Sequence, residues 1–332
     1  MTDNQDVLIQ VTDLKKWFPV QTSFLDTFFS KELQFVRAVD GVSFSIKRGE
    51  VFGLAGESGS GKTTIGRLVL GLEKPTEGEV IFDGIDLTSL DHEELRQLRK
   101  RMQVIFQDPM ASLNPRMSIG AAISHGLRIH FPDLSKEEVK EKTVQIMDKV
   151  GLSPSHFFYE KFPHQISGGQ RQRVVIARAL ITNPDLILAD EPIAMADVSV
   201  RALLLDTMIQ LKEEFNLTYL FITHDLATAK YICDRIGILY LGRFAEVAPL
   251  RDLYAYPLHP YTQALLAAVP VPDPKDRRTE EMPKGEIPNP INPPSGCRFH
   301  PRCPLAQDRC SQEEPQLREL RPDHFVACHF AE

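Results

Sequence analysis

Apolar residues recur along the chain in short runs with the spacing of β-strands. Four early runs alternate with polar residues or end at glycine, and they begin at Val7 (VLIQVTDL), Val42 (VSFSI), Glu50 (EVFGLAG) and Glu79 (EVIFDG). Two later runs, LILAD from Leu186 and TYLFITHD from Thr218, are continuously apolar and rich in β-forming residues. Such runs are typical of parallel strands that are buried on both faces.

Helical stretches lie between these strands. The most notable are GQRQRVVIARALI from Gly169 and VRALLLDTMIQLKEEF from Val200. Strands that alternate with helices predict an α/β core with a mostly parallel sheet. Residues of about 110–165 have a helical, polar-faced pattern, and we expect them to form an inserted subdomain.

The pattern changes toward the C-terminus, where half of the 24 prolines lie between Pro270 and Pro322. We therefore expect the tail to be mostly irregular and to need something that holds it in place. A second unusual stretch, residues 21–36, contains Phe24, Phe28, Phe29 and Phe35. We expect it to form a loop packed on the sheet, with attachment to a membrane surface as the less favoured alternative.

The composition excludes several classes of protein. Of 332 residues, 42% are hydrophobic and 25% charged, as in an ordinary soluble globular protein, and the net charge of −7 argues against a basic surface for nucleic acid. No apolar run approaches the roughly 18–20 residues of a membrane span, and the polar N-terminus is unlike a signal peptide. We expect a cytoplasmic protein that meets a membrane only through partners.

The segment GESGSGKT, from Gly56 to Thr63, fits G-x-x-x-x-G-K-[ST] and lies between a predicted strand and a predicted helix. Glycines allow the backbone to wrap a phosphate, with N–H groups that converge on the anion at the positive end of the helix. Lys62 is expected to reach the β- and γ-phosphates, and Thr63 to bind Mg²⁺. The predicted ATP contacts are Gly56, Glu57, Ser58, Gly59, Ser60, Gly61, Lys62, Thr63 and Thr64.

A pair of carboxylates at the end of LILADEP complements this loop. Asp190 ends an apolar strand, where it is placed to bind Mg²⁺ at the carboxyl edge of the sheet. Glu191 follows directly and is placed to orient or deprotonate the attacking water. An acidic pair after a strand is more often a helix cap, but a phosphate loop upstream favours catalysis.

The run ISGGQRQRV, from Ile166, resembles the LSGGQ signature of ABC-type ATPases, with isoleucine in place of the usual leucine. Other motifs of that family occur in the expected order: FQDP with Gln107 as the Q-loop, Asp197 in the D-loop and His224 in FITHD as the switch histidine. The resemblance covers residues 7 to about 250. More closely, FQDPMASLNPRM and FHPRCP look like the ATP-binding subunits of oligopeptide and dipeptide importers.

The resemblance implies an α/β fold: a P-loop NTPase core of the ABC type with an antiparallel β subdomain and a helical subdomain. The ATPase domain would span residues 1–250, with the helical subdomain at about 110–165. Residues 251–332 would form the C-terminal region of peptide importers, an irregular tail with a metal cluster. In this family two ATPase subunits pair head to tail and enclose two nucleotides between them.

The signature fits that pairing. Ser167, Gly168, Gly169 and Gln170 precede a helix, where a hydroxyl and bare N–H groups can bind an anion. The phosphates of this chain's own nucleotide are already held by the other loop, so this second anion site makes sense if it faces the ATP of another subunit. A role as helix cap alone would explain the serine but not the glycines.

The remaining motifs have roles that the resemblance implies. His224 contacts the γ-phosphate, and Gln107 lies near Mg²⁺ and the attacking water, next to the helical subdomain. Trp17 in LKKWFP stacks on adenine; Phe18 in its place, or a core position for Trp17, are the alternatives. The D-loop reads AMAD where the family usually has SALD, so Asp197 is kept and we expect the two sites of the dimer to hydrolyse unequally.

Four of the five cysteines crowd into the end of the chain. They are separated by five, six and seventeen residues, a spacing that does not by itself select a metal. A reducing compartment disfavours disulfides. Similar importer ATPases end in CxFHPRCP…C…C, which implies a [4Fe–4S] cluster that staples the tail, with zinc or free thiols as alternatives. The four expected ligands are Cys297, Cys303, Cys310 and Cys328.

Other residues near the tail are assigned lesser roles. We expect Cys233 to lie in the core. Three histidines could act as spare ligands, but we expect them to face solvent: His300, His324 and His329.

Taken together, these motifs predict the ATP-binding and hydrolysing subunit of an ABC importer for di- or oligopeptides. Its implied partners are a second ATPase subunit, expected to be a different chain, two permease subunits and an extracytoplasmic solute-binding protein. It would lie on the cytoplasmic face of the membrane. The alternatives are an importer of glycosides, nickel or opines and, less favoured, an ABC ATPase of DNA repair or ribosome function, against which the single phosphate loop and absent heptads argue.

Overall fold

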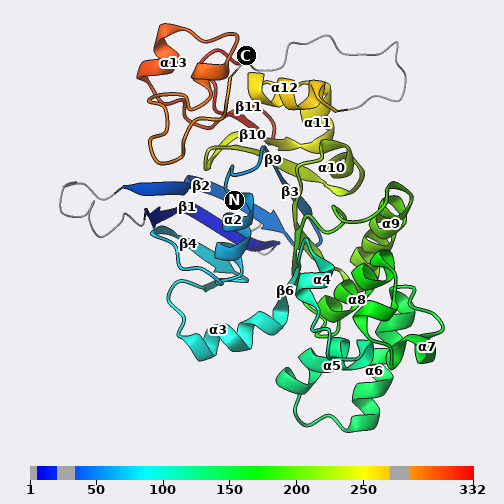
Figure 1. The fold of residues 1–332 in the computed structure, drawn as a ribbon. Helices are drawn as coiled ribbons and strands as arrows, with labels where there is room; N and C mark the ends of the chain where they lie inside the picture. Colours follow the sequence, from blue (N-terminus) through cyan, green and yellow to red (C-terminus); the bar gives the residue numbers. More distant parts are fainter. Residues whose placement is uncertain (1–5, 21–33, 270–284) are drawn as a thin grey trace, which may run out of the picture. The chain divides into compact units, whose positions relative to one another are not determined.

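In the computed structural model, residues 6–20, 34–269 and 285–332 are described (Figure 1). The chain divides into two units that interleave along the sequence. The first unit comprises Met1–Val7, Ile46–Val51 and Ser89–Ile222. The second comprises Leu8–Ser45, Phe52–Thr88 and Thr223–Glu332. Among the described residues, no helix is both long and apolar enough to cross a membrane.

Three parallel strands form the centre of the first unit. They are β6 (Met102–Ile105), β7 (Leu186–Asp190) and β8 (Thr218–Ile222), and β7 lies between the other two. All five residues of β8 are buried, which confirms the prediction made from its continuous apolar run.

Helices make up most of the rest of this unit. The predicted stretches at Gly169 and Val200 are confirmed as α8 and α9, while α5 packs against α6, α7 and α8 (Figure 1). The helices are α3 (His92–Leu98), α4 (Pro109–Ser112), α5 (Ile119–His130), α6 (Lys136–Lys149), α7 (Ser155–Tyr159), α8 (Gly168–Leu180) and α9 (Val198–Phe215), with 3-10 turns η1 (Arg99–Arg101) and η2 (Pro163–Gln165).

The ends of these helices follow from short-range sequence. Ser135 begins α6 with a capping box: its hydroxyl accepts from the backbone N–H of Glu138, and the Glu138 carboxylate accepts from the N–H of Ser135. Ser118 caps α5 with one hydrogen bond, which its hydroxyl accepts from the N–H of Ala121. The polar residues that precede the helical runs therefore determine where the helices start.

The second unit contains two groups of strands. In the first group, the order is β2-β1-β4-β5, and β4 is antiparallel to both β1 and β5. These strands are β1 (Val7–Pro19), β2 (Phe35–Lys47), β4 (Glu77–Phe82) and β5 (Ile85–Asp86). Most of the aromatic stretch 21–36 lies outside the described residues, but Phe35 begins β2 rather than belonging to a loop.

In the second group, β3 runs parallel to β9, and β10, β12 and β11 follow as antiparallel neighbours. These strands are β3 (Val51–Ala55), β9 (Arg235–Tyr240), β10 (Arg243–Pro249), β11 (Arg318–Arg321) and β12 (His324–Val326). The helices of this unit are α2 (Lys62–Val69), α10 (Leu226–Ile232), α11 (Leu250–Ala255), α12 (Pro260–Ala267) and α13 (Asp308–Gln312), with the 3-10 turn η4 (His300–Arg302).

The described part of the tail is better ordered than its proline content suggests. It is irregular in large part, as expected, but β12 pairs with β10 and so extends the sheet. Phe299 is fully buried and contacts the rings of Tyr240 and Tyr261, each with a ring-centroid distance of 5.3 Å. The described part of the tail thus buries aromatic surface against the sheet, which its proline content did not predict.

A buried polar pair fastens β12 to the sheet. The side chains of His324 and Glu246 are both 0% exposed, and His324 Nε2 lies 2.6 Å from Glu246 Oε1. Glu246 also accepts from the backbone N–H groups of Leu258 and His259, at 2.9 Å each. The expectation that His324 faces solvent is wrong, because pairing of β12 with β10 turns this side chain into the core. His300 and His329 are only partly exposed.

Replacing His324 by alanine should therefore loosen the tail. It leaves the Glu246 carboxylate buried with one partner fewer, so we expect a loss of about 3 kcal/mol in the free energy of unfolding. Urea unfolding of the purified chain measures this loss. The matched control is His329→Ala, since His329 is partly exposed and its ring hydrogen-bonds the backbone oxygen of Glu313 in the same tail. Equal effects of the two changes would contradict the role given to His324.

Candidate nucleotide-binding site

The phosphate loop lies between β3 and α2, as the sequence predicts, and its backbone has little room. Gly61 has φ +108°, and a Cβ atom there would lie 2.2 Å from the carbonyl oxygen of Ala38 in β2. A Cβ at Gly56, with φ +145°, would lie 2.2 Å from the carbonyl oxygen of Leu239 in β9. Only glycine fits both the dihedral angles and the space, so these residues are required by the close approach of three backbone segments.

Lys62 begins α2 and points back into the loop. Its ammonium group donates to the carbonyl oxygens of Gly56 and Glu57, at 2.8 and 2.9 Å, and the side chain is buried. The N-cap of the helix is Gly61, which supplies no side chain to the first N–H groups of α2. A loop with a lysine at its centre and a helix N-terminus at its end suits a phosphate anion.

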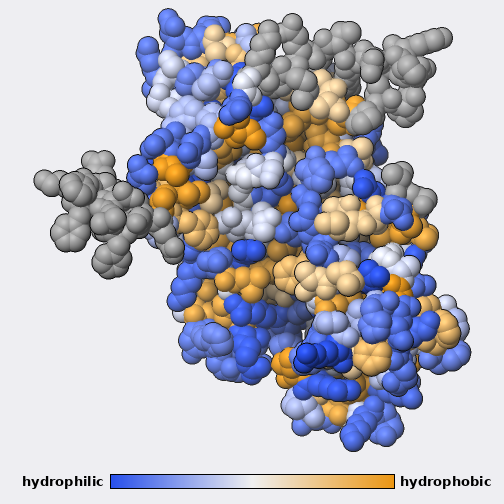
Figure 2. Space-filling view, in the orientation of Figure 1, coloured by the Kyte–Doolittle hydropathy of each residue, from blue (hydrophilic) through white to orange (hydrophobic). Residues whose placement is uncertain are grey.

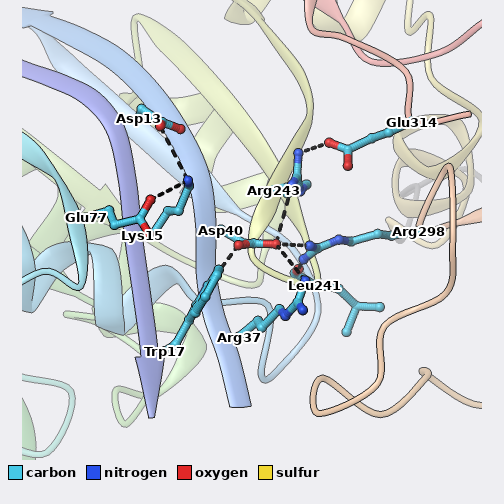
Figure 3. Close-up of polar contacts among 10 residues, drawn as sticks. All are labelled: Asp13, Lys15, Trp17, Arg37, Asp40, Glu77, Leu241, Arg243, Arg298 and Glu314. Atoms are coloured by element: carbon cyan, nitrogen blue, oxygen red, sulfur yellow. Dashed lines mark hydrogen bonds and ion pairs between the residues drawn. The ribbon is translucent and has the colours of Figure 1, made fainter. Parts of the chain in front are cut away.

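Trp17, predicted to stack on adenine, is held by the side chains around it. Its indole Nε1 donates to Asp40 Oδ1 at 2.8 Å, and the guanidinium of Arg37 lies 5.0 Å from the ring centroid (Figure 3). These contacts orient the ring, and adenine stacking by Trp17 stays a prediction.

Asp40 is the centre of a buried polar network that the sequence did not reveal. Figure 3 shows the three arginines that converge on it: Arg298 from the tail, Arg243 from β10 and Arg37 from β2, the last two 3.4 and 3.9 Å from Asp40 Oδ2. Arg298 also donates to the carbonyl oxygen of Leu241. Burial alone would raise the pKa of Asp40, but Arg298, the indole of Trp17 and Arg243 together hold it below its usual value.

The first unit carries the second half of the predicted chemistry. Asp190 ends β7, and Glu191 follows in the left-handed region with φ 47°, its N–H donating to the carbonyl oxygen of Ile222 at 2.9 Å. Gln107, 84 positions away in sequence, donates from Nε2 to Glu191 Oε2 at 3.0 Å. The fold thus places the predicted base in contact with the predicted Q-loop glutamine.

The signature and D-loop also lie in the first unit. Ser167 accepts from the N–H of Gln170 at 3.3 Å, and the Gln170 side chain accepts from the N–H of Ser167 at 2.9 Å, so together they cap α8. A Cβ at Gly168 would meet no atom within 4 Å, whereas Gly169 packs near Val200. The capping role of Ser167 is therefore present, and open space remains beside the first glycine.

The AMAD segment of the D-loop is held by a residue that motif reading missed. Arg201 donates from Nε to the carbonyl oxygen of Ala196 at 2.9 Å and from a terminal nitrogen to that of Ala194 at 3.4 Å. Asp197 is exposed at the start of α9. The arginine fixes the loop through its backbone, which any residue in the segment can supply.

The predicted site residues thus fall in both units, and each set is ordered by itself. The second unit holds Trp17, the residues from Gly56 to Thr64, and His224, which is exposed after Thr223. The first holds Gln107, Asp190, Glu191, Asp197 and the signature residues Ser167, Gly168, Gly169 and Gln170.

The four tail cysteines line one cavity of about 250 Å³, together with His329 and Phe299. Burial raises the pKa of the Cys297 thiol to about 11; a hydrogen bond from the backbone N–H of Phe299 opposes this rise, and the neighbouring cysteines contribute to it. All five cysteines of the chain are free, and Cys233 is buried as expected. Among the described residues, no three His, Cys, Asp or Glu side chains form a group that could hold a metal ion, so the structure gives no support to a metal in the tail, and the expected [4Fe–4S] cluster stays a prediction.

Comparisons with known proteins identify the family of this chain. Residues 39–194 match the ABC transporter family, and residues 245–310 match the oligopeptide/dipeptide transporter C-terminal region. The chain belongs to the ABC transporter family. It is 48% identical over 330 residues to the oligopeptide transport ATP-binding protein AppF of Bacillus subtilis, covering 98% of each chain. It is 53% identical over 293 residues to a putative peptide import ATP-binding protein of Brucella ovis, covering 88% of this chain and 92% of the relative.

A solved structure supports the fold. The ATP-binding cassette MJ0796, as a dimer in a post-hydrolysis state bound to ADP and Pi, is similar with a TM-score of 0.64 and 31% sequence identity. The match covers 73% of this chain and 99% of the cassette. The predicted ABC-type α/β core is therefore confirmed.

The Asp40 network should make stability depend on pH in acid. A carboxyl with a lowered pKa contributes its full stabilisation above the ordinary value of about 3.9 and loses it as pH falls through the lower value of the folded state. The change Asp40→Asn should cost about 3 kcal/mol at neutral pH. Urea unfolding at several pH values should show the gap between wild type and variant closing below about pH 4. A gap that is constant from pH 7 to pH 3 would contradict this explanation.

Proposed function

We propose that this chain is the subunit that binds and hydrolyses ATP in an ABC importer of di- or oligopeptides. The observation that carries the proposal is the phosphate loop, with Lys62 drawn into it by two carbonyl oxygens and glycines where only glycine fits. Relatives that are 48–53% identical over most of their length are named as peptide or oligopeptide ATP-binding proteins. The match of residues 245–310 supports the peptide class of cargo.

The residues suit Mg·ATP. Lys62 would move from its carbonyl partners to the β- and γ-phosphates, which offer a stronger charge. Mg²⁺ would be held by oxygen atoms of Thr63, Gln107 and Asp190, and would neutralise charge on the phosphates. Trp17 would stack on adenine.

Hydrolysis would depend on the pair in the first unit. Glu191 would take a proton from the attacking water, and Gln107, already hydrogen-bonded to it, would keep that carboxylate and the water in line. His224 would contact the γ-phosphate. These residues act on the nucleotide of this chain, whereas Ser167, Gly168, Gly169, Gln170 and Asp197 would act at the site shared with a partner.

The proposed assembly contains a second ATPase subunit, expected to be a different chain, and two permease subunits that receive solute from a binding protein. The permeases would hold this chain at the cytoplasmic face. Exposed apolar side chains beside the Q-loop suit such a contact: Phe106 and Met110 are 44% and 47% exposed. On the face drawn in Figure 2, hydrophobic residues lie in separate patches among hydrophilic ones. A permease subunit would contact such patches and not the whole surface.

We propose that the chain has the two parts expected from its sequence. Residues 1–250 would form the ATPase domain, with a helical subdomain at about 110–165, and residues 251–332 the C-terminal region. The matches at 39–194 and 245–310 support this division.

The change Glu191→Gln tests the catalytic assignment. It keeps the shape of the side chain but removes the base, so we expect ATP binding to persist and hydrolysis in the assembled transporter to fall by about 10²–10³-fold. Binding of a fluorescent ATP analogue and steady-state phosphate release measure the two properties. Hydrolysis near the wild-type rate would show that another residue is the base.

We also propose that the tail holds a [4Fe–4S] cluster. The support is that Cys297, Cys303, Cys310 and Cys328, separated by up to seventeen residues between neighbours, line a single cavity. Burial raises the pKa of the Cys297 and Cys303 thiols, which are therefore poor thiolates without a cation, and a cluster would supply the positive charge that stabilises them. The cluster would add to the contacts that already order the tail.

Anaerobic purification tests this assignment. We expect iron and inorganic sulfide in equal amounts and absorption in the visible range, and we expect both to be lost in Cys303→Ser. The control is Cys233→Ser, because Cys233 is buried outside the cavity. Stoichiometric zinc without colour, or thiols without metal, would refute the cluster.

A further inference from the structure

Two residues of the C-terminal region contact the phosphate loop directly, and both contacts are to Glu57. Arg302 in η4 donates from its two terminal nitrogens to the two carboxylate oxygens of Glu57, at 2.7 and 3.0 Å. The N–H of Glu57 donates to the hydroxyl of Tyr261 in α12 at 2.9 Å. The loop residue is thus held at its side chain and its backbone by residues more than 200 positions away in sequence.

The pair with Arg302 differs from an ordinary surface ion pair. The Arg302 side chain is only 8% exposed and that of Glu57 is 26% exposed. The guanidinium lies about 6 Å from the ring centroids of Tyr240 and Phe299, which limit its freedom. The hydrogen bonds with Glu57 raise the pKa of Arg302. A bidentate pair that is largely buried is geometrically fixed, and loss of one member leaves a charge without its partner.

The position of Glu57 makes this charge important. It lies inside the loop that is to receive a triphosphate, and an uncompensated carboxylate there would repel the nucleotide. Its carbonyl oxygen also accepts from Lys62, the residue expected to reach the phosphates. Arg302 therefore neutralises the carboxylate and holds the side chain of the residue whose carbonyl oxygen orients the lysine, while Tyr261 holds the backbone N–H of that residue.

We propose that Arg302 is a positioning residue for ATP binding, and that the C-terminal tail thereby forms part of the nucleotide site. This inference rests on the proposed function, since it requires that the loop binds ATP. It assigns the tail a role in this chain's own site, through charge on the loop, whether or not the cysteines hold a cluster.

The test compares five variants in the assembled transporter: Arg302→Gln, Arg302→Lys, Arg302→Gln with Glu57→Gln, Arg309→Gln and Lys62→Ala. Arg302→Gln should raise the Kd for ATP about tenfold, because the Glu57 carboxylate left without its partner repels the phosphates, with kcat at saturating ATP within about twofold of wild type. Arg302→Lys should recover part of the affinity because it keeps the charge. The double variant should recover most of it, because no carboxylate is left unpaired.

Arg309→Gln is the matched control. Arg309 lies in the same tail and pairs with Glu313 at 2.7 Å, but both side chains are more than half exposed, so ATP affinity should equal that of wild type. Urea unfolding of each variant shows whether the fold is kept. If Arg302→Gln does not fold, the ATP affinity of the double variant is compared with that of wild type instead.

Two results would overturn the proposal: wild-type affinity in Arg302→Gln, or affinity in the double variant that is as low as in the single one. The second would mean that Arg302 only supports the structure. Failure of the proposed function is a different outcome, because Lys62→Ala would then bind ATP as tightly as wild type. Loss of binding in Lys62→Ala with no effect of Arg302→Gln would reject the positioning role alone.

Discussion

The backbone packing of the phosphate loop is the constraint on which the surrounding structure depends. Gly61 lies against the carbonyl of Ala38, so that no side chain can be placed there. Gly242, in the turn between β9 and β10, donates to the carbonyl oxygen of Ser60 and accepts from the N–H of Asp40, both at 2.9 Å. The loop is therefore joined to β2 and to the β9–β10 turn by direct backbone contact, and a shift of either would displace the phosphate loop.

The C-terminal tail also contacts the phosphate loop and the residues packed around it. Arg298 donates to the carbonyl of Leu241 and to the carboxylate of Asp40, and Arg302, four residues later, holds Glu57 in the loop. Phe299 between them is buried against Tyr240 and Tyr261. One turn of the tail thus fills an apolar site and neutralises two acidic residues, which explains how a proline-rich segment is ordered by the protein itself.

The first unit is prepared for chemistry in a comparable way. Glu191 adopts a left-handed conformation directly after β7, and its N–H is bound by the last residue of β8. This sharp turn, a strained position for a residue other than glycine, brings its carboxylate to Gln107. Backbone strain at a predicted catalytic residue is consistent with a position kept for function rather than stability.

The sequence by itself determined what depends on neighbours along the chain. The phosphate loop, the buried strands β7 and β8, the cap formed by Ser135 and Glu138, and the family of the protein could all be predicted, because their signals lie within a few residues of each other. Only the tertiary structure decided the surroundings of His324, Asp40 and Glu57. Their partners are 78, 258 and 245 positions away, and no local pattern announces a contact over such a distance. His324 would face solvent if β12 had paired with another strand. The burial of charged and polar side chains in the tail therefore follows from the fold and not from the composition of the tail.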